Sequence, residues 1–431
     1  MRIVELNDNT RKDILTNLLK RNPGQYREYE DTVNEILANV RERGDKALFE
    51  YTEKFDHFAL DNNSVRVTDE EIEAAFESYD KELIRIMQDS AKNIIEYHKK
   101  QLQNSWIDTK PDGTILGQRI TPIEKVGVYV PGGKAAYPSS TLMCILPAKV
   151  AGVERIVMVT PCNAEGVVQP CTLVAAKIAG VNEIYKVGGA QAIAALAYGT
   201  ETIPKVDKIV GPGNIFVALA KKAVFGYVSI DSVAGPSEIL VIADETANPK
   251  YVAADLLSQA EHDQLASAIL ITTSRELAEK VNVEIDGFLK TLSRTDIIKS
   301  SLENYGYILI ADNENDAVSA ANDIASEHME ILTKNPYETM TKVKNAGAIF
   351  LGEYSSEPLG DYYAGPNHVL PTNGTAKFFS PLGVDAFIKR TSIISYSREA
   401  LLPVAEDIAK FADAEGLTAH ANSIRVRKEN N

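Results

Sequence analysis

The chain has 431 residues, of which 45% are hydrophobic and 24% charged, with a net charge of −15 and a pI of about 5.0. This length exceeds what one hydrophobic core normally holds, so two or more domains are expected. The acidic balance argues against nucleic acid and against an anionic membrane surface as partners, because both require a basic face. No signal peptide and no apolar run of membrane-spanning length is apparent. The three cysteines, Cys144, Cys162 and Cys171, lie in or near apolar segments, which indicates free thiols in a cytoplasmic protein.

The N-terminal quarter is predicted to be mostly helical. Residues 1–20 are interpreted as a short extension. From residue 23 to about 103, apolar residues recur at helical spacing among many surface charges. His57 and His98 lie in these helices, and we interpret both as surface or packing residues.

A regular alternation of short apolar strands and helices follows. Strands are predicted at 125–130, 155–160, 183–187, 207–210 and 228–231, with helices between them. Such alternation is typical of a parallel, doubly wound sheet, in which ligands bind off the carboxyl ends of the strands.

Three glycine turns lie where strands of this unit end. They are Pro131–Gly133, Gly188–Gln191 and Gly211–Asn214. None is a complete G-x-G-x-x-G, and no acidic residue follows at the usual offset in a strand, so a standard Rossmann pyrophosphate grip is not supported. Two interpretations therefore remain: that the turns bind a dinucleotide, and the simpler one that each turn only reverses the chain.

A second alternation starts at Ala234. The fold class is therefore α/β, with two Rossmann-like doubly wound domains, one inserted in the other, and extensions at both ends. The expected divisions are an N-terminal extension (1–20), a first α/β domain (21–128 and 238–381), an inserted α/β domain that binds NAD (129–237), and a C-terminal extension (382–431).

A candidate metal site begins in the segment DLLSQAEHD. Gln259 and His262 are three residues apart, so a helix over 248–264 places them on one face, one turn apart. Together with Asp361, in a Gly-rich loop, and His420 they offer oxygen and nitrogen donors without a thiolate, which suits zinc or manganese. The alternative is a polar helix face with a hydrogen-bonded histidine.

A candidate acid–base pair lies at the end of another predicted helix. Glu327 and His328 can serve one site only at a helix end, because adjacent helical residues point about 100° apart. A histidine base and a glutamate for a second proton suit stepwise oxidation. The alternative is a capping Ser326–Glu327 pair with a packed histidine. Cys144 is imaginable as a nucleophile, but its apolar helix offers no activating base, so we interpret it as structural.

Several long motifs together resemble the histidinol dehydrogenase family over essentially the whole chain. They are VGVYVPGG, VGGAQAIAALAYGT, KIVGPGN, DSVAGPSEILVIAD, DLLSQAEHD, SEHMEI, GDYYAGPNHVLPT and EGLTAHANSI. The resemblance implies oxidation of L-histidinol through the aldehyde to L-histidine, the last step of histidine biosynthesis, with two NAD+ reduced. It also implies one Zn2+ per active site and a homodimer whose subunits share active-site residues.

The resemblance assigns roles to particular positions. The zinc ligands would be Gln259, His262, Asp361 and His420. The substrate contacts would be Ser237, His328, Glu415 and those four ligands. The NAD contacts would be Tyr129, Gln191 and Asn214, one at each glycine turn, and the proton acceptors would be Glu327 and His328. His368 is left unassigned.

Three rival functions remain to be weighed. An oxidoreductase acting on another amino alcohol would be expected to change Ser237 or Glu415, and both match the family. A zinc-stabilised binding protein without catalysis would be expected to lose Glu327 or His328, and both are present. A metallohydrolase would leave the glycine-turn α/β unit without a purpose.

Overall fold

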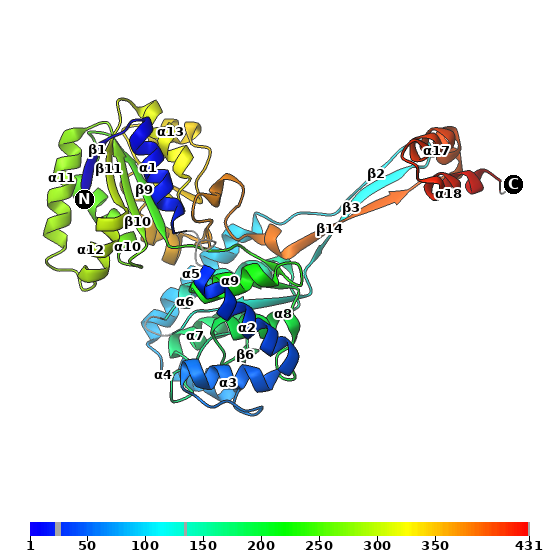
Figure 1. Cartoon of the computed structure of the whole chain (residues 1–431), viewed down its shortest axis with the longest axis horizontal. Coiled ribbons are helices and arrows are strands. Elements are labelled where there is room, and N and C mark those ends of the chain that lie inside the picture. Colours follow the sequence, from blue (N-terminus) through cyan, green and yellow to red (C-terminus); the bar gives the residue numbers. More distant parts are fainter. Residues whose placement is uncertain (22–26, 133–135, 430–431) are drawn as a thin grey trace. The chain divides into compact units, whose positions relative to one another are not determined.

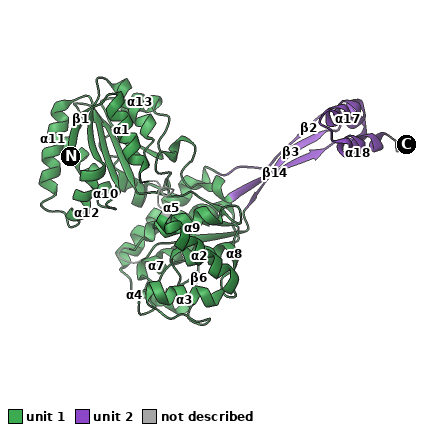
Figure 2. Cartoon of the chain, viewed as in Figure 1, with its two compact units in different colours: residues 1–101, 123–387 green, residues 102–122, 388–431 purple. Residues whose placement is uncertain are grey.

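The computed structural model of the chain describes residues 1–21, 27–132 and 136–429. Its internal contacts divide the chain into two units, residues 1–101 with 123–387 and residues 102–122 with 388–431 (Figure 2). Gly133, which closes the first of the three glycine turns, lies outside the described residues. Among the helices that are described, none combines the length and the apolar character needed to cross a bilayer.

The first unit contains a five-stranded parallel sheet in the order β6-β5-β4-β7-β8, whose edge strand β6 is labelled in Figure 1. Its strands are β4 (Lys125–Tyr129), β5 (Arg155–Val159), β6 (Ile184–Tyr185), β7 (Lys208–Val210) and β8 (Ser229–Ile230). The chain runs outward from β4 to β6 and then returns to add β7 on the other side of β4. The order of strands therefore reverses between β4 and β7, and this is the point where doubly wound sheets bind ligands.

Helices cover both faces of this sheet, as the alternation predicts. They are α6 (Pro138–Ala151), α7 (Pro170–Ala179), α8 (Gly189–Tyr198) and α9 (Ile215–Val224). Val126 and Val128 share a core with α6 and α7, whereas Tyr129 points to the opposite face and shares a core with α8 and α9. This two-sided burial explains why the strands are nearly continuous apolar runs.

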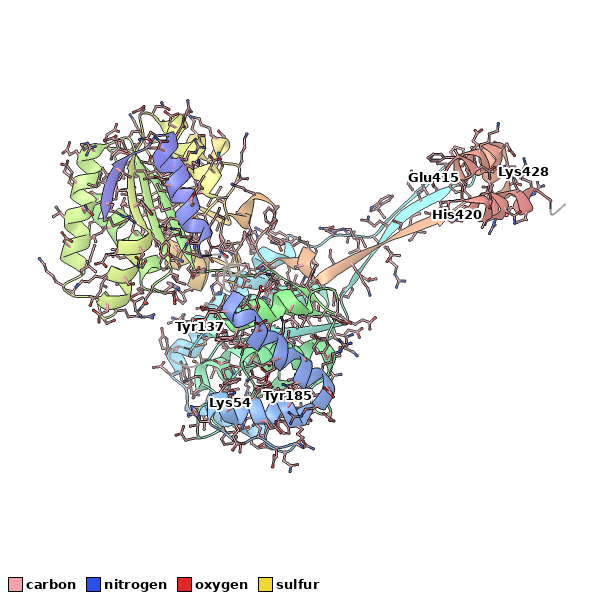
Figure 3. All side chains as sticks on the ribbon, viewed as in Figure 1. Lys54, Tyr137, Tyr185, Glu415, His420 and Lys428 are labelled. Carbon is pink, nitrogen blue, oxygen red and sulfur yellow. The ribbon has the colours of Figure 1, made fainter. Side chains whose placement is uncertain are left out.

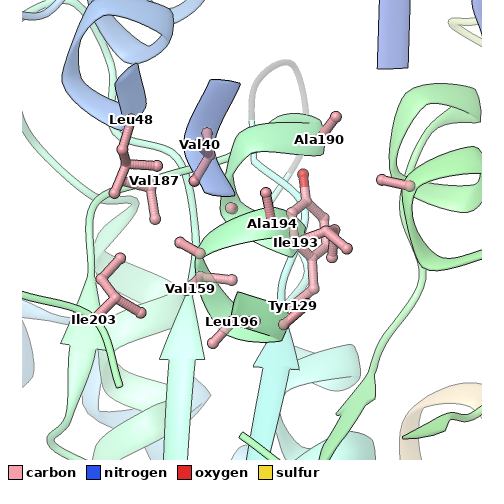
Figure 4. Packing of buried hydrophobic residues seen from close by; sticks show 14 of the residues in the cluster. Val40, Leu48, Tyr129, Val159, Val187, Ala190, Ile193, Ala194, Leu196 and Ile203 are labelled. Atoms are coloured by element: carbon pink, nitrogen blue, oxygen red, sulfur yellow. The ribbon is translucent and has the colours of Figure 1, made fainter. Parts of the chain in front are cut away.

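Four N-terminal helices pack on the same sheet: α2 (Arg27–Arg43), α3 (Asp45–Asp56), α4 (Asp69–Ser78) and α5 (Lys81–Lys99). Val40 and Leu48 of α2 and α3 lie in the core that contains Val159 and Leu196 (Figure 4), and α4 and α5 join the core of α6 and α7. This packing differs from the expected grouping of residues 21–128 with 238–381. An apolar stripe shows that a helix is buried on one side, but it does not specify which sheet it covers.

The first unit also contains a six-stranded parallel sheet in the order β1-β11-β10-β9-β12-β13. Its strands are β1 (Arg2–Glu5), β9 (Glu238–Ala243), β10 (Ser267–Thr272), β11 (Gly306–Ile310), β12 (His328–Leu332) and β13 (Ala348–Leu351). Apart from β1, the strand order repeats that of the first sheet, with the reversal between β9 and β12. The expectation of two doubly wound sheets is confirmed.

Helices also flank this second sheet. Those with residues in its two cores are α1 (Asp8–Leu19), α10 (Pro249–Ala260), α11 (Arg275–Phe288), α12 (Thr295–Tyr305) and α13 (Glu314–Ile324), and α14 (Pro336–Lys342) links β12 to β13. Ile14 and Leu18 bury the apolar side of α1 against the sheet, and β1 pairs with β11. Residues 1–20 are therefore part of this domain rather than an extension. The segment after β13 includes α15 (Glu357–Leu359), the single-turn π-helix η2 (Gly360–Ala364) and the 3-10 turns η3 (Thr375–Lys377) and η4 (Val384–Phe387).

The second unit is an antiparallel sheet with helices. Its strands, in the order β14-β3-β2, are β14 (Ile388–Ser395), β3 (Ile115–Pro122) and β2 (Trp106–Thr109), and its helices are α16 (Arg398–Leu401), η5 (Leu402–Val404), α17 (Ala405–Ala414) and α18 (Thr418–Glu429). The expected tail, 382–431, thus begins at 388 in the structure and takes in residues 102–122. The sequence does not reveal this sheet because its strands are mostly exposed and lack a clear alternation of apolar and polar residues.

Candidate active site

The candidate active site lies at the amino ends of β9 and β12, the two strands at which the order of the second sheet reverses. Glu327 follows the last turn of α13 and directly precedes β12, whose first residue is His328. Gly347, on the neighbouring segment, passes so close that a Cβ there would lie 2.4 Å from the Glu327 carbonyl oxygen. The backbone that carries Glu327 and His328 is therefore tightly packed on the β13 side.

Glu327 and His328 are both buried and both contact the backbone of Glu238, the first residue of β9. The Glu238 N–H donates to Glu327 Oε2 at 2.9 Å, and His328 Nδ1 lies 3.0 Å from the Glu238 carbonyl oxygen. A carbonyl can only accept, so Nδ1 carries a proton. In the neutral imidazole this leaves Nε2 as the bare nitrogen.

Burial raises the pKa of Glu327 to about 8; the adjacent His328 opposes this rise and the Glu238 carboxylate adds to it. For His328, burial is the largest single influence and lowers the pKa. The carboxylates of Glu327 and Asp361 outweigh it and raise the pKa to about 10. Without a metal ion both groups therefore hold a proton at neutral pH. A cation bound at Asp361, whose carboxylate raises both pKa values, would lower them and let the two groups act as bases.

Gln259 lies in the last turn of α10, but the helix ends at Ala260 rather than continuing to 264, so His262 lies just beyond it. The Gln259 side chain is 1% exposed, and neither of its amide atoms has a hydrogen-bond partner among the described residues. A buried amide without partners is costly, which indicates that a ligand completes its bonding. Desolvation lowers the pKa of His262 and the nearby Asp361 carboxylate opposes this, so His262 can present a neutral nitrogen.

Asp361 is placed by the π-helical turn after α15. Its carboxylate oxygens lie 3.6 Å from His328 Nε2 and 3.7 Å from His368 Nδ1. Burial raises its pKa, but His328 and His368 together hold the pKa at about 2, so Asp361 is an anion. Gln259, His262, Glu327, His328 and Asp361, all predicted from the sequence, therefore belong to one region.

A group of three potential metal ligands emerges within this region. One donor atom each of His328, Glu357 and Asp361 lies within 4.8 Å of the other two. Glu357 accepts a hydrogen bond from Ser258, the neighbour of Gln259, at 3.0 Å. Burial raises the pKa of Glu357 to about 8, with a further rise from Asp361. Two carboxylates and one histidine at this separation are suitable ligands for a divalent cation.

Sequence reasoning missed three members of this region. Glu357 precedes Asp361 by four residues, a spacing that places both on one side of a helical turn and could have identified it. His368, which had no assigned role, bridges the Asp361 carbonyl oxygen at 3.2 Å and Ser140 Oγ at 3.3 Å. Glu238 offered only the weak signal of a charged residue at the start of a fully buried strand.

Two predicted residues lie elsewhere in the chain. His420 is in α18 and Glu415 follows α17, so both belong to the second unit and both are exposed (Figure 3). The other predicted site residues all lie in the first unit. Ser237 directly precedes β9, and its carbonyl accepts from Ser267 N.

The predicted NAD contacts surround the reversal point of the first sheet. Tyr129 ends β4, its hydroxyl oxygen accepts the Gly189 N–H at 3.2 Å, and its ring lies beside α8 (Figure 4). Gln191 is in the first turn of α8, and Asn214 caps the start of α9. Gly211 has φ +116°, and a Cβ there would lie 2.1 Å from the Tyr129 carbonyl oxygen. A side chain is therefore excluded at Gly211, which lies between the ends of β4 and β7. Helix N-termini follow these strand ends, and such termini bind phosphate favourably.

The cysteines play no visible part in this site. All three are free and buried, as expected. Burial raises the pKa of Cys144 well above its usual range, so its thiol is a poor nucleophile.

Comparison with known proteins identifies the family. A family model described as histidinol dehydrogenase matches residues 19–428. The chain belongs to this family. A histidinol dehydrogenase of Clostridium acetobutylicum is 59% identical over 396 residues, which cover 92% of this chain and 91% of that protein. A histidinol dehydrogenase of Caldanaerobacter subterraneus subsp. tengcongensis is 56% identical over 428 residues, which cover 99% of each chain.

A solved structure supports the same relationship. The crystal structure of histidinol dehydrogenase from Elizabethkingia anophelis matches with a TM-score of 0.93 at 37% identity, covering 100% of this chain and 98% of that one. The histidinol dehydrogenase fold therefore extends over both units described above.

Proposed function

We propose that the chain oxidises L-histidinol to L-histidine, the last step of histidine biosynthesis, with two NAD+ as hydride acceptors and one Zn2+ per site. The observation that carries the proposal is the buried Glu327–His328 pair beside Gln259, His262 and Asp361 in a member of the histidinol dehydrogenase family. The alcohol carbon loses two hydrides in turn, one water supplies the second carboxylate oxygen, and the released protons pass to bases.

The donor set fits a zinc ion. Gln259, His262 and Asp361 would hold it, and His420 would complete a set of nitrogen and oxygen ligands. The unpartnered Gln259 amide supports this assignment, because a metal would use the bonding capacity that the protein leaves unsatisfied. When bound, zinc would supply a cation that orients the nitrogens of histidinol and offsets the charge of Asp361. The cluster of His328, Glu357 and Asp361 is an alternative ligand set, and substitution of Glu357 distinguishes it from the first.

NAD+ would contact Tyr129, Gln191 and Asn214. Burial raises the pKa of Tyr129 to about 12, so its phenol keeps its proton and can donate to a ligand while it accepts the Gly189 N–H. Asn214 caps α9 by accepting the Val217 N–H, and the other N–H groups of that first helical turn would be available to an anion. NAD+ would accept the hydride at each oxidation.

The protein's own side chains would handle the protons. His328 Nε2 has no hydrogen-bond partner among the described residues and would take the proton of the substrate hydroxyl. The Nδ1–H bond to Glu238 fixes the tautomer that makes this possible, and the adjacent Asp361 carboxylate stabilises the resulting imidazolium. Glu327 would then remove a proton from water during hydration of the aldehyde, and His328 would act again in the second oxidation.

We also propose that the enzyme is a homodimer in which the second unit of each subunit contributes Glu415 and His420 to its partner's site. Large apolar side chains on this unit support the proposal, because Ile394 and Phe411 are 73% and 72% exposed. Apolar surface of this kind is characteristic of protein interfaces.

Complementation tests the shared site. Mixtures of His328→Ala and His420→Ala subunits, unfolded and refolded together, should regain about a quarter of the wild-type rate if sites are shared, since one site in each hybrid dimer is then intact. Hybrid dimers without activity would place all the residues of a site in one chain.

Chelation tests the proposed reaction. The rate of NADH formation from L-histidinol should fall when zinc is removed and return when zinc is added back to a protein that stays folded throughout. Full activity in a protein shown to be metal-free would exclude the zinc role. No activity in the folded, zinc-loaded protein would direct attention to another amino alcohol.

A further inference from the structure

A completely buried ion pair lies behind the two catalytic residues. Arg21 Nη2 contacts Glu238 Oε1 at 2.5 Å, and the two side chains are 0% and 3% exposed. Burying two charges requires a large desolvation free energy, and a pair of apolar residues commonly gives equal or greater stability at such a place. A contribution to stability alone is therefore a weak explanation for this pair.

The pair connects directly to the catalytic residues through Glu238. The Glu238 carboxylate uses Oε1 for Arg21 and Oε2 for the Glu327 N–H, at 3.3 Å. The backbone of the same residue donates to the Glu327 carboxylate and accepts from His328. One residue thus fixes the position of Glu327 at its backbone and its side chain, and fixes the tautomer of His328.

Arg21 also holds the segment that carries His262. Its Nη1 donates to the Leu265 carbonyl oxygen at 2.9 Å, and its guanidinium lies 5.2 Å from the centre of the Tyr305 ring. The residues before it form β1 and α1, whose burial on the second sheet brings Arg21 to this position. The N-terminal segment therefore supplies a charged group to the region around the site.

We propose that Arg21 and Glu238 are positioning residues, and that Arg21 holds the Glu238 carboxylate in the one orientation that aligns Glu327 and His328 for proton transfer. This inference rests on the proposed function, because the roles of Glu327 and His328 come from it. Without Arg21, the Glu238 carboxylate is left buried and unpaired, and it must move toward water or take up a proton. Either change weakens its bond to the Glu327 N–H.

The test compares Arg21→Met, Glu238→Leu, Glu238→Gln and the double variant Arg21→Met/Glu238→Leu with the wild-type enzyme. Arg11→Met is the matched control, since Arg11 lies on α1 and pairs with Asp323 and Ser319 at the surface. Each zinc-loaded protein is characterised by its thermal midpoint, zinc content, and kcat and KM for histidinol and for histidinal. In 15N-histidine-labelled protein, NMR follows exchange of the His328 Nδ1 proton, a readout that does not depend on turnover.

Arg21→Met and Glu238→Leu should each lower kcat by about 10- to 100-fold at nearly unchanged KM, as is usual for residues that orient a site. The loss should be greater for histidinal, because Glu327 contacts Glu238 twice. Glu238→Gln should retain part of the rate, since its amide oxygen can still accept one hydrogen bond, and Arg11→Met should match the wild type.

The double variant gives the decisive comparison. It removes both charges, so its thermal midpoint should return toward the wild-type value. Its kcat should stay low, and the His328 Nδ1 proton should exchange rapidly. Recovery of kcat together with the midpoint would mean that the pair is only structural, and wild-type kcat in the single variants would also overturn the proposal. A wild-type enzyme that does not oxidise histidinol would instead refute the proposed function, and proton exchange would still report whether Arg21 orders His328.

Discussion

Replacing Glu327 by Gln should stabilise the metal-free protein while it prevents histidine formation. The carboxyl is 7% exposed, and burial raises its pKa from the usual 4.5 to about 8. A glutamine of the same shape can keep an oxygen toward the Glu238 N–H, but it never ionises. The substitution therefore removes a charge that the folded state tolerates poorly and a base that the reaction needs.

The magnitude follows from the two pKa values. Between about pH 4.5 and about pH 8 the unfolded chain has lost a proton that folded Glu327 retains, so the wild-type free energy of unfolding falls by up to about 1.4 kcal/mol per pH unit. The difference in favour of Glu327→Gln should therefore grow across this interval and reach at most about 4–5 kcal/mol at its upper end. Below the lower pKa both proteins carry an uncharged side chain, and their stabilities should agree.

Urea unfolding of the two zinc-free proteins from about pH 5 to about pH 8 measures this difference. Glu276→Gln, an exposed position paired with Lys280, should change the stability by no more than about 0.5 kcal/mol at any of these pH values. Loss of a general base should reduce the rate of histidinal oxidation by about 100- to 10,000-fold. Stability curves of wild type and Glu327→Gln that coincide over the whole interval would refute the assignment of a raised pKa to this residue.

Three further predictions concern other parts of the account. Gly211→Ala should raise the KM for NAD+ by about tenfold or more without changing zinc content, because the added Cβ meets the Tyr129 carbonyl oxygen; an unchanged KM would exclude a tight fit at this turn. Gln259→Leu should stabilise the zinc-free protein by about 1–3 kcal/mol, measured by unfolding in urea, and should lose zinc on dialysis, because the buried amide has no partner among the described residues. Retained zinc would remove Gln259 from the ligand set. Cys144→Ala should keep the wild-type kcat, and Cys144 should resist alkylation in the folded enzyme; inactivation that follows modification of Cys144 would instead make it a nucleophile.

Much of the fold follows from local patterns in the sequence. The strands of both doubly wound sheets are continuous apolar runs, and β4, β5 and β7 lie within a residue of their predicted bounds. These patterns do not show which helix packs against which sheet. The helices before residue 100 carry apolar stripes that fit either sheet. Strands β2 and β14 are too exposed, and β3 is too evenly half-buried, to show the alternation of a half-buried sheet.

The site was predictable only where its residues follow local rules. Glu327 and His328 were proposed as a pair because they follow the end of a predicted helix. Gln259 and His262 were proposed because a helix over 248–264 would place them one turn apart, although α10 ends at Ala260. Arg21 and Glu238 are separated by more than two hundred residues and meet only after the second sheet forms. No local sequence pattern indicates a contact between residues so far apart in the chain, so this ion pair can be identified only from the structure.

The central claim is that one site carries out two successive oxidations. The most direct measurement is the amount of NADH formed from a limiting quantity of L-histidinol, together with chromatographic identification of the product. We expect two NADH and one L-histidine for each histidinol consumed. One NADH with accumulation of the aldehyde would contradict it, because Glu327 would then have no role in hydration and the second oxidation.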